Sequence, residues 1–276
     1  MASAPKANLP VFYKDLIPLN SNEHGDYTAR TVDKAAWVAH QHAVPLTVEE
    51  FPAAQRNYPI VFSAGDNAVP LALMGLNEGV NVFFDDEGTP VDAPTPYIPA
   101  YIRRYPFILA KLDKNSDNLS LCFDPTTDLV GKFDDGAALF TDDKQPTEHT
   151  QGLLQFCEKF EQAGARTQAF MKELKDHDLL MDGEVAIQRA DAPNDPFTYR
   201  GFQMVNQDKL RELRGDQLRK WNENGLLPLI VAHLFSLDLM RTVFARQVEQ
   251  GKGPIAAANG AAPAAPAADK PKAKKS

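Results

Sequence analysis

The spacing of the hydrophobic residues changes at Thr147, and this change constrains the fold more than any other feature of the chain. Beyond it, apolar residues recur at intervals of three and four, which places them on one face of a helix. The residues of that face are Leu153, Leu154, Phe156, Cys157, Phe160, Ala163, Phe170, Met171 and Leu174. The pattern predicts one long amphipathic helix over 148–176.

Before Thr147 the chain contains short runs of β-branched and aromatic residues bounded by Gly, Pro, Asn and Asp, which are typical of strands and turns. The predicted strands cover 58–63, 69–76, 80–84, 107–112 and 119–123. Turn residues between successive runs suggest a meander. Thr47 and Glu50 have the capping-box spacing, which predicts a short helix over about 48–56.

After the long helix we expect a strand pair and then two more helices. The strands cover 185–188 and 199–205, a polar helix covers 207–222, and an apolar helix covers 226–249. The order predicts an α+β fold in which a β-rich part, a meander or mixed sheet, packs with a helical part.

We expect residues 1–250 to form a single domain, β-rich over 10–146 and mainly helical over 147–250. The remainder, 251–276, is rich in Ala, Pro and Lys and predicts a disordered tail, because it has too few large apolar residues to bury a core.

Charge limits the partners of the folded part. The tail holds five lysines and one aspartate, which leaves 1–250 with a charge of −12 against −8 for the whole chain. An acidic body repels phosphate backbones, so we expect no nucleic-acid binding by it.

The most apolar stretch, 226–240, is interrupted by polar residues and is shorter than the ~20 residues of a membrane span. The sequence therefore predicts no membrane span. The N-terminus lacks the pattern of a secretory signal, which favours the cytoplasm. The alternative is export or cell-surface association without a recognisable signal.

Residues 94–107 are the most distinctive segment, with four prolines, three tyrosines, a phenylalanine and two adjacent arginines. Guanidinium groups beside aromatic faces can hold carboxylates, phosphates or planar rings. We therefore predict a ligand or partner site here. Its residues are Tyr97, Tyr101, Arg103, Arg104, Tyr105 and Phe107. The alternative is structural: the arginines pair with acidic neighbours, and the tyrosines pack a connection stiffened by proline.

Two other patterns could carry chemistry. His24 and Asp26 have the His-x-Asp spacing of an iron site, although a polar turn explains the same residues. His233 and Ser236 share one face of the last helix, as a base and nucleophile would, or as a buried histidine beside a helix-surface serine would. The cysteines, Cys122 and Cys157, have no metal-site spacing and predict reduced, structural thiols.

Four segments, in order, resemble the bacterial SapC family, which takes its name from a surface-layer locus: 50–62, 97–107, 201–210 and 226–237. The string YIPAYIRRYPF over 97–107 is the most specific, and the resemblance spans about 10–245. It implies no reaction or catalytic residue. It does imply a role in a bacterial surface-related or peptide-modification and uptake system.

These observations lead us to expect an accessory or binding protein, without a cofactor, whose partner is a protein or peptide. The alternative is an iron-dependent oxygenase that acts on a peptide or small molecule, with His24 and Asp26 as ligands.

Overall fold

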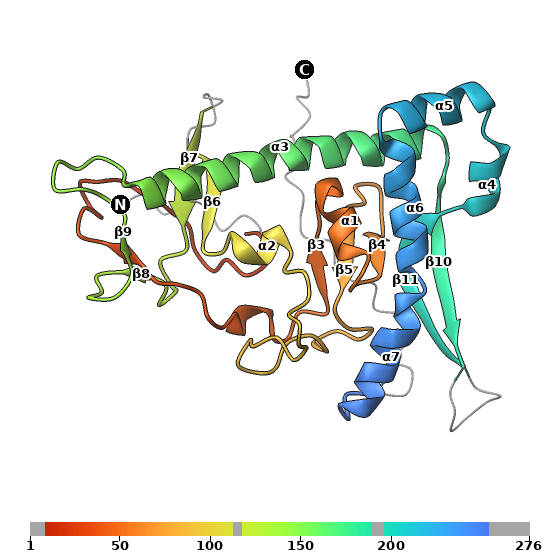
Figure 1. Cartoon of the computed structure of the whole chain (residues 1–276), viewed down its shortest axis with the longest axis horizontal. Helices are drawn as coiled ribbons and strands as arrows, with labels where there is room; N and C mark the ends of the chain where they lie inside the picture. Colours follow the sequence, from red (N-terminus) through yellow and green to blue (C-terminus); the bar gives the residue numbers. More distant parts are fainter. Residues whose placement is uncertain (1–8, 113–117, 189–195, 254–276) are drawn as a thin grey trace, which may run out of the picture.

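The protein was analysed as a computed structural model, which describes residues 9–112, 118–188 and 196–253 (Figure 1). Most of the predicted tail, from residue 254 onward, lies outside the described residues. The strands are β1 (Ile17–Pro18), β2 (Thr28–Ala29), β3 (Ala43–Pro45), β4 (Ile60–Ser63), β5 (Pro70–Leu73), β6 (Phe107–Lys111), β7 (Leu119–Phe123), β8 (Val130–Gly131), β9 (Ala137–Ala138), β10 (Leu180–Ile187) and β11 (Phe197–Val205). The helices are η1 (Ala36–Val38), η2 (Val48–Glu50), α1 (Phe51–Ala54), α2 (Ala100–Arg103), α3 (Glu148–Asp176), α4 (Gln207–Glu212), α5 (Gly215–Glu223), α6 (Leu226–Ser236) and α7 (Leu239–Glu249).

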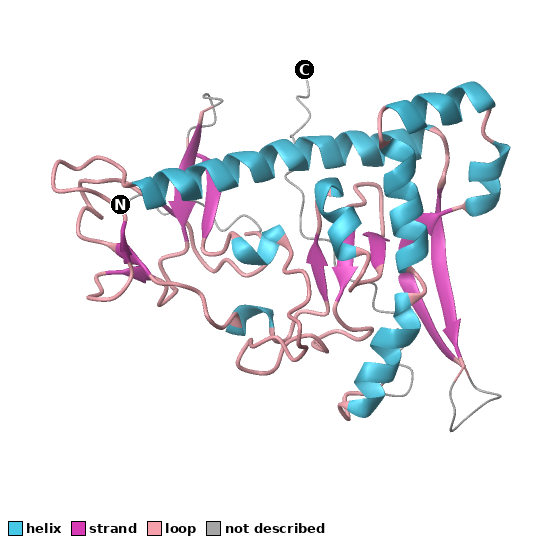
Figure 2. Ribbon diagram, in the orientation of Figure 1, coloured by secondary structure: helices cyan, strands magenta, loops and turns pink. Residues whose placement is uncertain are grey.

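The described strands form three antiparallel sheets (Figure 2). The largest has the order β10-β11-β4-β5-β3, and the two smaller ones have the orders β1-β7-β6 and β8-β2-β9. Sheets therefore dominate the N-terminal half and helices the C-terminal half, which confirms the α+β class. The hairpins β4–β5 and β6–β7, predicted as parts of a meander, belong to two different sheets.

Helix α3 begins and ends where its hydrophobic spacing predicts, and it runs along the molecule from the small sheets to the large one (Figure 1). The Thr147 hydroxyl caps its first turn by accepting a hydrogen bond from the Thr150 amide at 3.3 Å. Cys157 packs into a core cluster with β6 and β7, whereas Phe170 and Leu174 pack into the cluster of the large sheet. One face of α3 thus covers two cores.

The predicted strand at 80–84 is wrong, because the side chain of Asn81 takes two of the backbone amides that a strand would use, those of Phe83 and Phe84. Its amide nitrogen donates to the carbonyl oxygens of Val38 and Gln41, at 2.9 and 3.1 Å. Its oxygen accepts from the amides of Phe83 and Phe84, at 2.8 and 3.1 Å. The segment is consequently a buried bend that the hydrogen bonds of the Asn81 side chain hold in place.

The capping box is confirmed, and the helix that it starts is short. The Glu50 carboxylate accepts a hydrogen bond from the Thr47 amide at 2.9 Å and another from the Thr47 hydroxyl at 2.8 Å. The 3-10 turn η2 follows and continues into α1. Glu50 is buried, so its carboxylate needs these donors.

His233 on α6 fastens the large sheet to the helices. Its ring Nε2 accepts a hydrogen bond from the Val205 amide of β11 at 3.1 Å, and its Nδ1 lies 2.8 Å from the Ile60 carbonyl oxygen of β4, to which it donates as the neutral tautomer. Ser236 donates to the His233 carbonyl oxygen and accepts from the Ile60 amide. Burial lowers the pKa of His233 to about 4. Both side chains therefore stabilise the fold, as expected for a buried histidine beside a helix-surface serine.

Helices α6 and α7 together form a stretch from Leu226 to Glu249 that is long and apolar enough to cross a membrane, judged by length and composition only. The most apolar stretch of the sequence ends at residue 240, so it is shorter than the stretch that the two helices form. Part of it is buried core, as Ile230 and His233 are, but Phe235 is 72% exposed. A core helix of a water-soluble protein meets the same criterion, so the absence of a membrane span stays a prediction.

Both cysteines are free thiols inside the protein, as predicted. Cys122 lies on β7 and Cys157 on α3, and burial raises the pKa of each to about 11. A thiol with so high a pKa is a poor nucleophile at neutral pH.

Candidate functional site

The Tyr97–Phe107 segment is tied to the core through Glu50. The carboxylate of Glu50 accepts hydrogen bonds from the Ala100 amide at 2.6 Å and the Tyr97 hydroxyl at 3.1 Å. The Asn57 side chain accepts from the Tyr97 amide at 3.1 Å, and the Tyr58 hydroxyl donates to the Tyr97 carbonyl oxygen at 2.8 Å. These bonds hold the entrance to α2 in one position.

Arg104 follows the structural alternative. It is only 6% exposed, and its guanidinium group lies over the rings of Phe160 and Tyr101, at 4.2 and 4.6 Å from their centroids. One terminal nitrogen lies 3.5 Å from a carboxylate oxygen of Glu161 on α3. Burial raises the pKa of Glu161, and Arg104 opposes that shift. Arg104 thus joins α2 to α3.

The three other buried members of the predicted site also pack inside. Tyr101 donates a hydrogen bond to the Val11 carbonyl oxygen at 3.2 Å. Tyr105 packs against Tyr13 and Trp37, with ring centroids 5.2 and 4.6 Å apart. The carbonyl oxygen of Phe107 accepts from the Tyr13 hydroxyl at 2.7 Å. Their roles here are contacts within the core.

Arg103 and Tyr97 reach the surface. The Nε of Arg103 donates to the Ile98 carbonyl oxygen at 3.0 Å, and one terminal nitrogen lies 3.4 Å from the Tyr97 hydroxyl. The Arg103 guanidinium carbon lies 5.3 Å from the ring centroid of Phe156 on α3. Partial burial and the Glu50 carboxylate raise the pKa of Tyr97 to about 12. Of the six predicted residues, these two are available to a ligand.

A pocket of about 250 Å³ lies beside Arg103. Its walls come from three segments: residues 32–37, the turn 84–90, and residues 98–103. They are mostly apolar, and Asp33 and Arg103 supply the charges. The lining residues are Val32, Asp33, Ala35, Trp37, Phe84, Gly88, Pro90, Ile98, Ile102 and Arg103. An apolar hollow with a few polar groups is the usual form of a ligand site.

Two contacts hold the first two walls together. The Ala35 amide donates to the Gly88 carbonyl oxygen at 2.9 Å, and Lys34 pairs with Glu87 at the surface. Gly88 has a φ of +81°, and a Cβ atom there would lie 2.1 Å from the carbonyl carbon of Ala35. Only glycine fits at that point of the wall.

Gly88→Ala is therefore expected to destabilise the protein more than Gly79→Ala. Gly79 has a similar φ of +78° and nothing within 4 Å of the added Cβ. The control change costs about 1–2 kcal/mol of left-handed strain. The Gly88 change adds a backbone clash, for which we expect at least a further ~2 kcal/mol. Denaturant unfolding of both variants measures the difference, and equal losses would contradict a close approach at Gly88.

His24 and Asp26 do not converge. The ring of His24 is buried beside those of Tyr27 and Phe123, and its Nδ1 accepts from the Asn20 amide at 3.1 Å. Asp26 pairs with Lys132 at the surface, at 2.6 Å. Within 9–112, 118–188 and 196–253, no group of three or more His, Cys, Asp or Glu side chains could hold a metal ion. The iron-site alternative has no support from this geometry.

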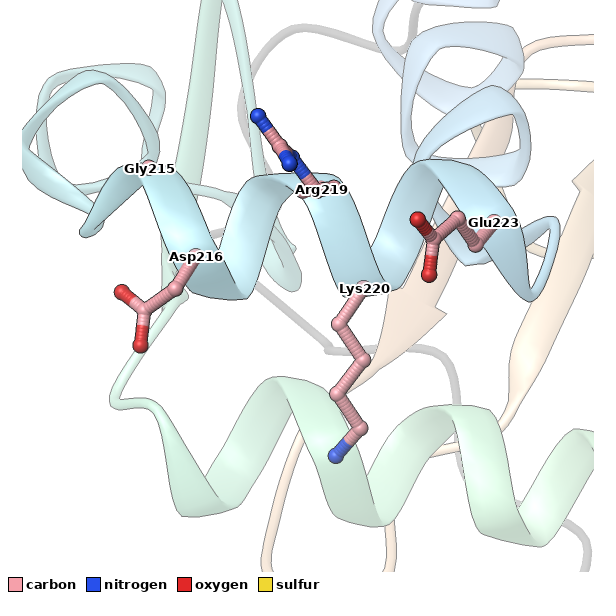
Figure 3. A pocket seen from close by; sticks show the side chains of 5 residues that line it. All are labelled: Gly215, Asp216, Arg219, Lys220 and Glu223. Carbon is pink, nitrogen blue, oxygen red and sulfur yellow. The ribbon is translucent and has the colours of Figure 1, made fainter.

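A second pocket, of about 310 Å³, lies on α5 (Figure 3). It is lined by Gly215, Asp216, Arg219, Lys220 and Glu223. All five belong to one helix, and Figure 3 shows Lys220 extending toward the neighbouring helix while Arg219 points away from it. The charges of both signs do not surround one point, so this pocket is the weaker candidate.

Sequence reasoning found Arg103 and missed the rest of the pocket beside α2. Val32, Asp33 and Trp37 stand in no recognisable motif, and the strand predicted over 80–84 reaches only the first residue of 84–90. Hydrogen bonds of Asn81 with Val38 and of Gly88 with Ala35 hold that turn against residues 35–38, and no local pattern predicts them.

Comparison with known proteins gives one match. The sequence model of the SapC family matches residues 19–243, a range that includes the pocket, α3 and His233. No curated protein and no solved structure matches the chain. Because the family match covers most of the sequence, this chain belongs to the SapC family.

Proposed function

We propose that this chain is an accessory binding protein that takes an apolar side chain of a peptide partner into the pocket beside α2. The lining of the pocket carries the proposal: its walls are mostly apolar, and the Arg103 guanidinium group and the Asp33 carboxylate lie among them. In that role the protein would hold a peptide for other members of a bacterial surface-related or peptide-modification and uptake system.

The size of the pocket favours a single residue as its occupant. Sites for drug-sized ligands and cofactors usually measure about 300–1,000 Å³. The pocket of about 250 Å³ lies just below that range and suits one apolar side chain with its backbone. The rings of Trp37 and Phe84 offer flat apolar contacts for it.

The two tryptophans allow a direct test. Trp37 lines the pocket, whereas the indole nitrogen of Trp221 donates to Glu173 on α3, at 3.2 Å. In a proton–nitrogen NMR spectrum, Gly-Gly-Phe is expected to shift the indole signal of Trp37 and leave that of Trp221 in place. Gly-Gly-Gly, which lacks an apolar side chain, is expected to shift neither.

Val32→Phe is expected to weaken the binding of Gly-Gly-Phe at least tenfold, because the larger side chain fills the pocket. Val32 is 42% exposed, so the change leaves the core intact. Val91→Phe is the matched control, since Val91 is similarly exposed and does not line the pocket. Unchanged binding by the Val32 variant would refute the assignment of the pocket.

A further inference from the structure

We infer that the residue bound in this pocket is a C-terminal one, whose α-carboxylate pairs with Arg103 and whose α-nitrogen donates to Asp33. The inference rests on the proposed function and names the ligand chemistry of the same pocket. It draws on three polar groups of the lining, Arg103, Trp37 and Asp33.

Arg103 has guanidinium hydrogens to offer. Its Nε is used by the Ile98 carbonyl oxygen, and the contact of one terminal nitrogen with the Tyr97 hydroxyl is long, at 3.4 Å. It forms no ion pair with an acidic side chain of the described part of the chain. A guanidinium group fixed at Nε keeps its outer hydrogens aligned for a carboxylate.

Trp37 supplies a second donor. Its indole nitrogen is buried and has no acceptor among the described residues, although the ring packs on Tyr105. A buried donor without an acceptor costs free energy. A ligand oxygen that reaches this nitrogen from the pocket lined by Trp37 would remove that cost.

Asp33 supplies an acceptor. It is exposed and makes no hydrogen bond or ion pair within 9–112, 118–188 and 196–253, whereas its neighbour Lys34 pairs with Glu87. The unpaired carboxylate of Asp33 would repel a ligand that carries only a negative charge. It would accept a hydrogen bond from the backbone N–H group of a C-terminal residue, next to the α-carboxylate. The pair Arg103 and Asp33 thus matches the two ends of one amino-acid backbone.

The background charge strengthens the case for Arg103. Residues 1–250 carry −12, so the surface as a whole repels carboxylates. Attraction of a C-terminus must therefore come from a local cation, and Arg103 is the cation of this lining. The same chemistry is present in a free apolar amino acid, whose α-ammonium group would face Asp33 as an ion pair.

The test compares matched ligands by the Trp37 indole shift. Gly-Gly-Phe and Gly-Gly-Phe-amide differ only in the carboxylate, and we expect the amide to bind at least tenfold more weakly. Arg103→Ala is expected to remove this preference and Arg103→Lys to keep part of it. Arg219→Ala on α5 is the control and should leave it unchanged.

Free phenylalanine and the Asp33→Asn variant distinguish a peptide ligand from a free amino acid. If the peptide is the ligand, Gly-Gly-Phe binds at least as tightly as phenylalanine, although Asp33→Asn weakens phenylalanine more, because only the free amino acid loses an ion pair. If phenylalanine binds more tightly and loses more affinity in the variant, the carboxylate assignment stands and the peptide assignment fails. Equal binding of acid and amide at Trp37 would overturn the inference and leave the proposed function intact. No shift of Trp37 with any ligand at millimolar concentration would overturn both.

Discussion

The free energy of unfolding is expected to fall by about 3 kcal/mol between pH 7 and pH 4 because of one residue, His233. Its pKa is about 4 in the folded protein and about 6.5 in an unfolded chain. Above pH 6.5 the ring is neutral in both states. As the pH falls below 6.5, the unfolded chain takes up a proton that the native ring refuses, so stability is lost until about pH 4. At about 1.4 kcal/mol for each pKa unit, the difference between 6.5 and 4 amounts to about 3.5 kcal/mol, of which about 3 kcal/mol is lost by pH 4, where the native ring is half protonated.

Denaturant unfolding of the native protein and of His233→Gln at several pH values isolates this loss. The carboxylates titrate in both proteins, so their effect cancels in the difference between the two free energies of unfolding. The stability advantage of the native protein should shrink as the pH is lowered. His40→Gln, at an exposed histidine, should follow the native curve. Parallel curves for the native protein and the His233 variant would contradict the assignment. If the variant does not fold, NMR titration of the native protein gives the same answer, since His233 should stay neutral above pH 5.

Glu50→Gln is expected to lower the free energy of unfolding by about 2–4 kcal/mol, a cost set by hydrogen bonds to a buried charge. Each carboxylate oxygen of Glu50 accepts two bonds: one from the Ala100 amide and the Tyr97 hydroxyl, the other from the amide and hydroxyl of Thr47. Glutamine replaces one of these oxygens by an NH₂ group. The backbone amide bound to that oxygen would then face a donor, and the hydroxyl could stay bonded only by turning to accept.

Glu49→Gln is the matched control. Glu49 is the preceding residue, half-exposed, and pairs with Arg166 at the surface, where an ion pair contributes less than about 1 kcal/mol. Denaturant unfolding at pH 7 measures both variants. Equal stabilities would mean that the Glu50 carboxylate is not the anchor of the segment before α2.

The elements that could be predicted from the sequence are those determined by local patterns. Helix α3 follows from its three- and four-residue spacing, and the Thr47–Glu50 capping box follows from two side chains three residues apart. The hairpins β4–β5 and β6–β7 follow from apolar runs separated by turns. Each of these signals lies within one stretch of the chain.

The parts that could not be predicted depend on contacts between distant residues. The pairing of β4 with β11 joins Phe62 to Gln203, and no local pattern encodes it. The two adjacent arginines illustrate the limit at the site. Neighbours at helical spacing point about 100° apart, so Arg104, the residue that caps the end of α2, turns into the core while Arg103 stays at the surface. Which of the two turns inward is decided by Glu161 and Phe160, which lie on α3.

The length of α3 has a consequence for the order in which the protein can fold during synthesis. At about 1.5 Å per residue its 29 residues extend for about 43 Å, and they cover both the cluster around β6 and β7 and that of the large sheet. A nascent chain presents β1 to β9 before any of α3 has emerged. The apolar side chains of Phe51, Phe62 and Phe107 therefore stay uncovered until α3 has been synthesised. Strand β4 lacks its partner β11 for longer still. Premature termination before α3 would leave both clusters uncovered, a state prone to aggregation.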